Sequence, residues 1–268
     1  MNKTALVNHI RTRQTCLCVG LDLHPSRLPS HISQNASGWL DFNRQIIDAT
    51  RDLCVAYKPN WAFYEALGLE AIEVLLKTID YIGDEHLIIA DAKRGDIGNT
   101  SSRYAQAVFE YFKADAITVS PYMGIDSLEP FRSPGKWLVA LALTSNPGSL
   151  DFQTTELKNG HQLYEEVLDK LSRAFSKEEM MFVVGATHPG LFKKIRQIIP
   201  EHFLLVPGVG AQGGDLRSVM VNGMNSEIGL LINSSRSILY ASDGKDFADA
   251  ARGKALDYRN EMKGLISS

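Results

Sequence analysis

The feature that most constrains the fold is a series of eight short apolar runs spread along the whole chain. Each run has the length and β-branched content of a strand buried on both faces, without regular polar alternation. Longer segments with helical spacing separate the runs, such as the one in which Tyr104, Val108 and Phe112 recur every four residues. The runs are Cys16–Asp22, Cys54–Pro59, His86–Lys93, Ala114–Ser120, Lys136–Leu143, Met180–Thr187, Phe203–Gly208 and Ile228–Ser234.

Eight alternations of strand and helix predict an α/β fold of the (β/α)8 TIM-barrel type. The main alternative is a doubly wound open sheet, which would favour a GxGxxG turn after the first strand, whereas Gly20 is followed here by LDLHP. The segment between the last two runs, about 214–224, is short for a barrel helix. Because no linker, short repeat or low-complexity tract interrupts the chain, we expect one domain over residues 1–268.

The composition argues against large charged partners and membranes. The formal net charge is −3, from 28 basic and 31 acidic residues, so no polyanion-binding face is indicated and nucleic acid is a poor candidate. No run approaches the roughly 18 apolar residues of a membrane span, and the N-terminus lacks the apolar region of a signal peptide. The cysteines Cys16, Cys18 and Cys54 lie in apolar stretches, which is typical of buried thiols and a cytoplasmic protein.

Polar residues at strand ends are the candidates for function, because barrel active sites gather at the carboxyl ends of the strands. The segment LIIADAKRGDIGNT carries Asp91, Lys93 and Asp96 at the end of the third run. Side chains two apart in a strand share one face, so Asp91 and Lys93 are expected to point the same way. Gly95 is expected to let the chain turn, which would aim Asp96 separately. With Lys58 at the preceding strand end, these residues predict a charged cluster that keeps a lysine protonated until chemistry consumes its proton.

Two further strand ends predict a phosphate site. The seventh run leads into PGVGAQGGD, whose glycines leave backbone N–H groups open to an anion. The eighth run leads into Ser235 and Arg236, and a guanidinium holds phosphate with paired donors. The loop SNPGSLDFQ, 145–153, is a candidate lid. His24 and His188 lack partners at ligand spacing, so no metal site is predicted.

Together these motifs resemble those of the orotidine 5′-phosphate decarboxylase family. DAKRGDIGNT matches the family's DxKxxDIxxT signature, VPGVGAQGGD is similar to its phosphate loop, and TSNPGS is similar to its strand-five loop. The resemblance covers nearly the whole chain, from VGLD to SSR. It implies a barrel that is usually dimeric, that needs no cofactor or metal, and that converts orotidine 5′-monophosphate to UMP and CO2.

The resemblance also implies a role for each matching residue on the sugar and base side of the substrate. Asp22 and Lys58 would hold ribose hydroxyls. Lys93 would protonate C6 of the pyrimidine, and Asp91 would lie beside the substrate carboxylate. Ser145 would contact the pyrimidine ring.

Other matching residues would reach the substrate from the phosphate end and from a second subunit. Gln212 and Arg236 would bind the 5′-phosphate, with Ser235 beside them among the substrate-binding residues. The residues expected to come from the partner of a homodimer and to complete the neighbour's site are Asp96, Ile97 and Thr100.

The chain departs from the common family pattern at two of these motifs. Lys58 is followed by Pro59 and Asn60, where many members have Lys-x-Gly, and Ser235 stands where many have glycine. These departures and the long segment between Asp22 and Lys58 resemble a longer bacterial subgroup. Three alternatives stay open: a metal-dependent barrel acting on a sugar phosphate, a Schiff-base aldolase, and a non-catalytic nucleotide-binding protein.

Overall fold

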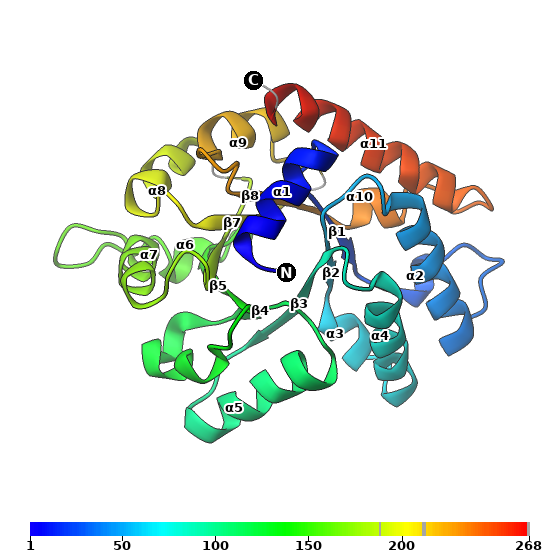
Figure 1. Ribbon diagram of the computed structural model, residues 1–268, viewed down its shortest axis with the longest axis horizontal. Helices are drawn as coiled ribbons and strands as arrows, with labels where there is room; N and C mark the ends of the chain where they lie inside the picture. Colours follow the sequence, from blue (N-terminus) through cyan, green and yellow to red (C-terminus); the bar gives the residue numbers. More distant parts are fainter. Residues whose placement is uncertain (188, 211–212, 267–268) are drawn as a thin grey trace.

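The computed structural model describes residues 1–187, 189–210 and 213–266. Within these ranges eight parallel strands pair in chain order and close into a barrel, with β8 returning to β1 (Figure 1). The predicted fold is confirmed, since every predicted run overlaps one strand. The strands are β1 (Leu17–Leu21), β2 (Ala56–Pro59), β3 (Leu87–Arg94), β4 (Ala116–Val119), β5 (Trp137–Leu143), β6 (Met180–Val184), β7 (Phe203–Pro207) and β8 (Leu230–Ser234).

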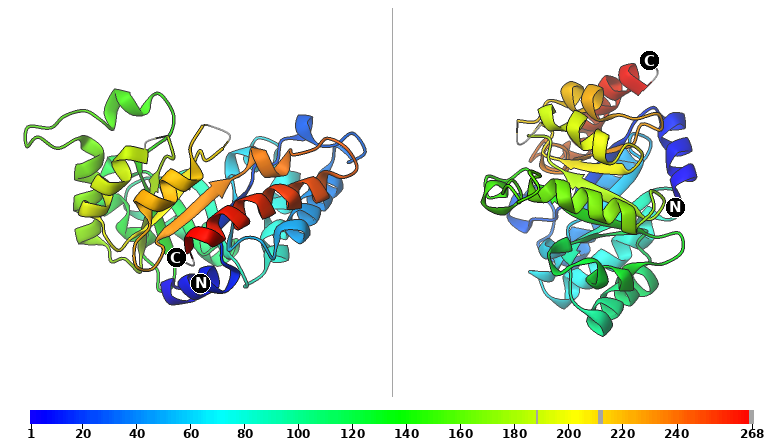
Figure 2. Two further views of the ribbon diagram at one scale, coloured as in Figure 1. Left: turned by 90° about the horizontal axis from the view of Figure 1, so that it is seen from above. Right: turned by 90° about the vertical axis from the view of Figure 1, so that its left-hand side faces the viewer.

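Helices surround the barrel, as the views in Figures 1 and 2 show. The α-helices in the described ranges are α1 (Lys3–Arg13), α2 (Ala36–Thr50), α3 (Trp61–Glu65), α4 (Leu69–Ile82), α5 (Gly98–Gln106), α6 (Ser149–Phe152), α7 (Leu163–Ala174), α8 (Phe192–Ile198), α9 (Leu216–Gly223), α10 (Arg236–Leu239) and α11 (Phe247–Ile266). Short 3-10 turns are η1 (Pro25–Arg27), η3 (Pro121–Met123), η4 (Ile125–Ser127), η5 (Glu129–Phe131) and η6 (Pro189–Leu191), and η2 (Ala107–Tyr111) is a π-helical turn. The segment with Tyr104 and Val108 forms α5 and η2, and α9 is short as expected. None of the described helices combines the length and apolar character needed to cross a membrane.

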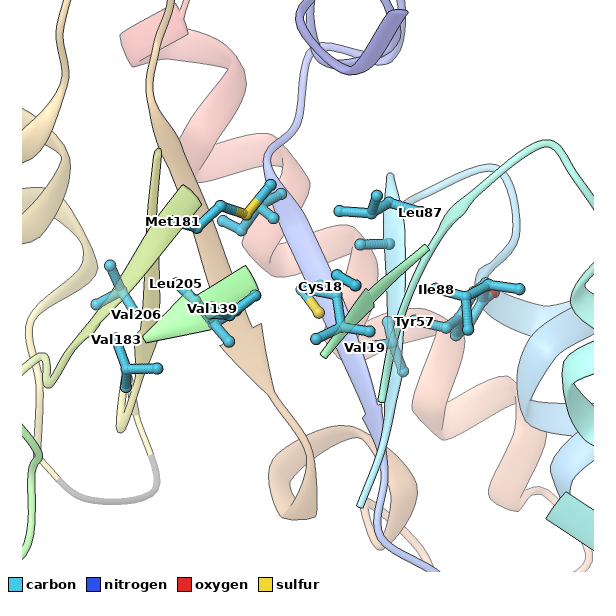
Figure 3. Close-up of a cluster of buried hydrophobic side chains, with 14 of the residues drawn as sticks. Cys18, Val19, Tyr57, Leu87, Ile88, Val139, Met181, Val183, Leu205 and Val206 are labelled. Atoms are coloured by element: carbon cyan, nitrogen blue, oxygen red, sulfur yellow. The ribbon is translucent and has the colours of Figure 1, made fainter. Parts of the chain in front are cut away.

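The strands are buried on both faces because side chains fill the barrel and helices cover its outside. Figure 3 shows one cluster of these side chains, in which Val139, Met181 and Leu205 are at most 2% exposed. Apolar runs without polar alternation are therefore what this architecture requires, and they explain why the strands were predictable.

Helix α1 lies against the N-terminal ends of the strands and overlies the barrel in the view of Figure 1. The Met1 ammonium is 2.6 Å from Asp115 Oδ1, one residue before β4 begins. The Trp137 indole N–H donates to the Met1 carbonyl at 2.9 Å, at the start of β5. These contacts hold α1 at the end of the barrel opposite the carboxyl ends of the strands.

A buried histidine lies at the same N-terminal end. His86 precedes β3, is fully buried, and donates from Nε2 to the Arg51 carbonyl at 2.8 Å. Its ring meets the His9 ring edge-on, with 5.4 Å between centroids. Burial lowers the pKa of His86 to about 4, so the ring is neutral near pH 7.

Candidate active site

A cavity of about 450 Å³ lies at the carboxyl ends of the strands. Among the described residues, each of the eight strands or the loop after it contributes to the cavity wall. This is the end of the barrel at which the sequence predicted function. The predicted site residues that line the cavity are Asp22, Lys58, Asp91, Lys93, Ser145, Ser235 and Arg236.

The Asp91 carboxylate binds two lysine ammonium groups in the wall of this cavity. Lys58 Nζ lies 2.6 Å from Asp91 Oδ2, and Lys93 Nζ lies 2.5 Å from Asp91 Oδ1. Asp91 is 8% exposed and Lys58 is 5% exposed, whereas half of the Lys93 side chain is accessible. Lys58 is thus the enclosed partner of Asp91, and Lys93 is the ammonium that faces the open space.

Ion pairing outweighs burial in this cluster. Burial disfavours a charged Asp91, yet the ammonium groups of Lys58 and Lys93 hold the pKa of its carboxyl well below the usual range. Burial also acts against a charged Lys58, yet the carboxylates of Asp91 and Asp22 raise its pKa. Asp91 and Lys58 are therefore both charged at neutral pH.

The backbone around Lys93 is not a regular strand. The pairing of β3 with β4 shifts register between Ala90 and Arg94, and Lys93 has a φ of +47°, in the left-handed region. The side chains of Asp91 and Lys93 do meet, as predicted, but a bulge brings them together. The irregularity also comes two residues before Gly95, where the sequence suggested a turn. Gly95 directly follows the end of β3 at Arg94, and it also allows close packing, since a Cβ there would lie 3.3 Å from the Ser120 carbonyl oxygen.

Asp22 enters the cavity just after β1. The Tyr240 hydroxyl donates to the Asp22 carbonyl at 2.7 Å and accepts the His24 N–H at 2.9 Å, which fixes the backbone here. The Asp22 Oδ1 atom is buried without a hydrogen-bond partner among the described residues. A buried carboxylate oxygen without a donor is a natural acceptor for a ligand hydroxyl.

The end of β8 forms the side of the cavity where phosphate binding was predicted. Ser235 and Arg236 follow β8 directly, and α10 begins at Arg236. Gly20 in β1 makes room for this turn, because a Cβ at that position would lie 1.9 Å from Ser235 Oγ. Gly208 lines the cavity after β7 with a φ of +95°, a conformation that glycine adopts without strain. Gln212 lies outside the described residues, so its role stays a prediction.

Ser145 lines the cavity after β5 and begins the candidate lid loop, 145–153. Gly185 permits its close approach, because a Cβ there would lie 2.7 Å from Ser145 Cα. The two ends of the loop are joined by the Gln153 side chain. Its Oε1 accepts the Thr144 N–H at 2.7 Å, and its Nε2 donates to Thr144 Oγ1 at 2.9 Å.

Asp96, Ile97 and Thr100 do not line the cavity. Within the described chain, no residue between Lys93 and Thr118 contributes to its wall. Asp96 Oδ1 accepts the Ile97 N–H at 2.7 Å, and the side chains of Ile97 and Thr100 are exposed, Ile97 at 61%. Residues that complete the site of a second subunit must be accessible on the surface of the first, as Ile97 and Thr100 are. That these residues reach a partner's site stays a prediction.

Several cavity residues were not assigned a role from the sequence, among them Asn60, Phe63, Thr118 and Asn233. Asn233 belongs to the strand-end segment NSSR, and its buried Oδ1 lacks a partner among the described residues. Asn60 and Phe63 follow β2, and Thr118 lies within the short fourth strand. Asn60 and Asn233 could have been found as polar residues at strand ends. Thr118 could not, because threonine is common in strands and carries no motif.

No grouping of three or more His, Cys, Asp or Glu side chains able to hold a metal ion occurs across the described ranges. His24 is exposed and contacts Phe63, and His188 lies outside the described residues.

Comparisons with known proteins agree with this geometry. A family model described as "Orotidine 5'-phosphate decarboxylase / HUMPS family" matches residues 15–251. The orotidine 5'-phosphate decarboxylase of Bacteroides fragilis strain YCH46 is 50% identical over 266 residues, 98% of this chain and 97% of that protein. The enzyme of the same name from Parabacteroides distasonis is 51% identical over 270 residues, 99% and 96% of the two chains. The structure of Leishmania donovani OMP decarboxylase superposes with a TM-score of 0.82 at 35% identity, covering 97% of this chain and all of that one.

Proposed function

Because the chain belongs to the orotidine 5′-phosphate decarboxylase / HUMPS family, we propose that it converts orotidine 5′-monophosphate to UMP and CO2, the last step of de novo UMP synthesis. The observation that carries this proposal is the Asp91 carboxylate, which holds two ammonium groups in a cavity at the carboxyl ends of the strands. The barrel over residues 1–268 would act as one domain.

The chemistry of the substrate defines what the site must supply. Loss of CO2 from C6 of the pyrimidine leaves an electron pair in the plane of the ring, where no adjacent π-system delocalises it. Stabilisation of that carbanion is therefore electrostatic, and a fixed cation aimed at C6 provides it. The same cation, if it is an ammonium, completes the reaction by donating a proton to C6.

Lys93 is the residue we assign to both tasks. Its ammonium is accessible from the cavity, whereas Lys58 is enclosed. Asp91 holds the Lys93 ammonium at 2.5 Å, which orients it before substrate arrives. Asp91 would also lie beside the substrate carboxylate, where repulsion is relieved as CO2 leaves.

The remaining cavity residues would bind the substrate away from C6. Asp22 and Lys58 would hold the ribose hydroxyls, and the unpartnered Asp22 Oδ1 supports this. Ser145 would contact the pyrimidine. The residues assigned to the phosphate end are Gln212, Ser235 and Arg236. Because phosphate binding is remote from C6, its binding energy would serve loop closure and lower the barrier rather than only tighten binding.

We further propose a homodimer in which each chain completes the site of the other. Asp96, Ile97 and Thr100 would enter the partner's cavity. All three lie outside the chain's own cavity, and the exposure of Ile97 and Thr100 supports this arrangement. Asp96 would add a second carboxylate near the partner's Lys93. The free, buried cysteines support a cytoplasmic location.

The test is loss of ultraviolet absorbance after orotidine 5′-monophosphate is added to the protein with EDTA present. Rapid turnover that EDTA does not affect is the expected result. If the folded protein shows no turnover, the proposal is wrong, and activity that appears only with Mg²⁺ and a ketose phosphate would establish the metal-dependent alternative. Borohydride trapping of a lysine with substrate would instead reveal a Schiff base.

A further inference from the structure

Thr118 lines the cavity and contacts two of its charged residues, Asp91 and Lys93. It is the residue of β4 that reaches the cavity wall among the described residues, and it is 1% exposed. We propose that Thr118 is a positioning residue that fixes Lys93 and Asp91 in their reactive arrangement. The inference rests on the proposed decarboxylase function.

The Thr118 hydroxyl joins the backbone of one of these residues to the side chain of the other. Its Oγ1 accepts the backbone N–H of Lys93 at 2.9 Å and donates to Asp91 Oδ1 at 3.1 Å. The Ala90 carbonyl is farther away, at 3.5 Å, and is uncharged, so the hydroxyl proton belongs to the carboxylate. The Thr118 hydroxyl thus accepts one hydrogen bond from Lys93 and donates its proton to Asp91.

The bulge in β3 explains why this hydroxyl is needed. Lys93 has a left-handed backbone, which is unfavourable for a residue with a Cβ and persists only where the surroundings enforce it. The register shift between Ala90 and Arg94 interrupts the ladder with β4 at this point. Thr118 Oγ1 accepts the hydrogen bond of the Lys93 N–H in place of a backbone carbonyl. It therefore fixes the backbone position of Lys93, from which the side chain extends.

The same hydroxyl restricts the carboxylate. Asp91 Oδ1 receives Lys93 Nζ and Thr118 Oγ1, while Oδ2 receives Lys58 Nζ. With a donor from each of β2, β3 and β4, the carboxylate cannot rotate without losing a contact. Lys93 is therefore held at its backbone and at its ammonium by groups that Thr118 connects.

The experiment compares three variants with wild type in steady-state decarboxylation and in binding of the product UMP. Thr118→Val keeps the branched shape but has no hydroxyl, and Thr118→Ser keeps the hydroxyl. The control is Thr78→Val on α4, which removes another fully buried threonine hydroxyl that accepts from Asn43 Nδ2 at 2.9 Å, away from the cavity.

We expect Thr118→Val to lower kcat by roughly 10- to 100-fold, as loss of a hydrogen bond to a charged group does. KM and the Kd for UMP should stay within about threefold, because the hydroxyl bonds to the catalytic pair and not to the phosphate or ribose side. Thr118→Ser should recover kcat to within about threefold of wild type, and Thr78→Val should keep the wild-type kcat.

Wild-type kcat in a folded Thr118→Val variant would overturn the assignment, and so would an equal loss in Thr118→Ser and Thr118→Val. If Thr118→Val does not fold, Thr118→Ala replaces it, and the comparison with Thr118→Ser decides in the same way. Absence of turnover in the wild type would overturn the proposed function itself. Normal wild-type turnover beside an unaffected Thr118 variant would overturn only the role of Thr118.

Discussion

Acidification is expected to destabilise the barrel through His86, at the end opposite the candidate active site. The side chain is fully buried, and Nε2 meets the Arg51 carbonyl, which only accepts, so the neutral ring carries its proton on Nε2. Nδ1 has no hydrogen-bond partner among the described residues. A second proton would therefore bind at Nδ1 and make the buried ring an imidazolium cation. Nδ1 lies 3.9 Å from Glu85 Oε2, and Glu85 is already paired with Arg13.

The size of the effect follows from the shift in pKa. Burial lowers the pKa of His86 from 6.5 to about 4. Below pH 6.5 His86 is protonated in the unfolded protein but stays neutral in the folded protein. The free energy of unfolding therefore falls as the pH falls, until His86 of the folded protein is also protonated near pH 4. This difference in proton binding lowers the free energy of unfolding by about 2 kcal/mol between pH 7.5 and pH 5. Over the full titration of both states the decrease is about 3 kcal/mol.

Urea unfolding at pH 7.5 and pH 5 measures this term when wild type is compared with His86→Gln. Glutamine does not titrate, and its amide still offers a donor for the Arg51 carbonyl. The matched control is His161→Gln, because the His161 side chain is 57% exposed. The free energy of unfolding should fall by about 2 kcal/mol less in His86→Gln than in wild type or the control. An equal fall in all three proteins would refute the reasoning.

Three further predictions concern the candidate site. Lys93→Ala should lose nearly all turnover while remaining folded, because stabiliser and proton donor disappear together; turnover above about one hundredth of wild type would contradict the assignment. Arg236→Ala should raise KM by roughly 10- to 100-fold, and an unchanged KM in steady-state assays would place the phosphate elsewhere. Lys93→Ala and Asp96→Ala subunits, unfolded and refolded as a mixture, should regain about a quarter of wild-type activity, because half of the dimers are mixed and each has one intact site. No gain on mixing would contradict a shared site.

Much of the fold was predictable because its determinants are local. A strand buried on both faces must be apolar throughout, so β1 to β8 could be located from short runs without knowledge of their neighbours. The bulge in β3 was not predictable from the sequence. Lys93 has a left-handed backbone, and its N–H bonds to Thr118 Oγ1 from the adjacent strand, a contact that no local pattern indicates.

The candidate site divides in the same way. Asp22, Lys58, Asp91 and Lys93 were recognisable because polar residues at strand ends are conspicuous against apolar runs, and barrel closure brings such ends together. Thr118 was not recognisable, since threonine is common in strands and only its contacts with Asp91 and Lys93 distinguish it.

The sequence by itself thus determined where the strands lie and which polar residues stand at their ends. Both follow from local patterns, namely apolar runs that alternate with helical segments. Tertiary structure decided that Asp91 binds both lysines, that Lys58 is enclosed while Lys93 faces the cavity, and that Asp96 lies outside it. The physical reason is that burial and pairing depend on distances between side chains from different strands, and those distances exist only once the barrel has closed.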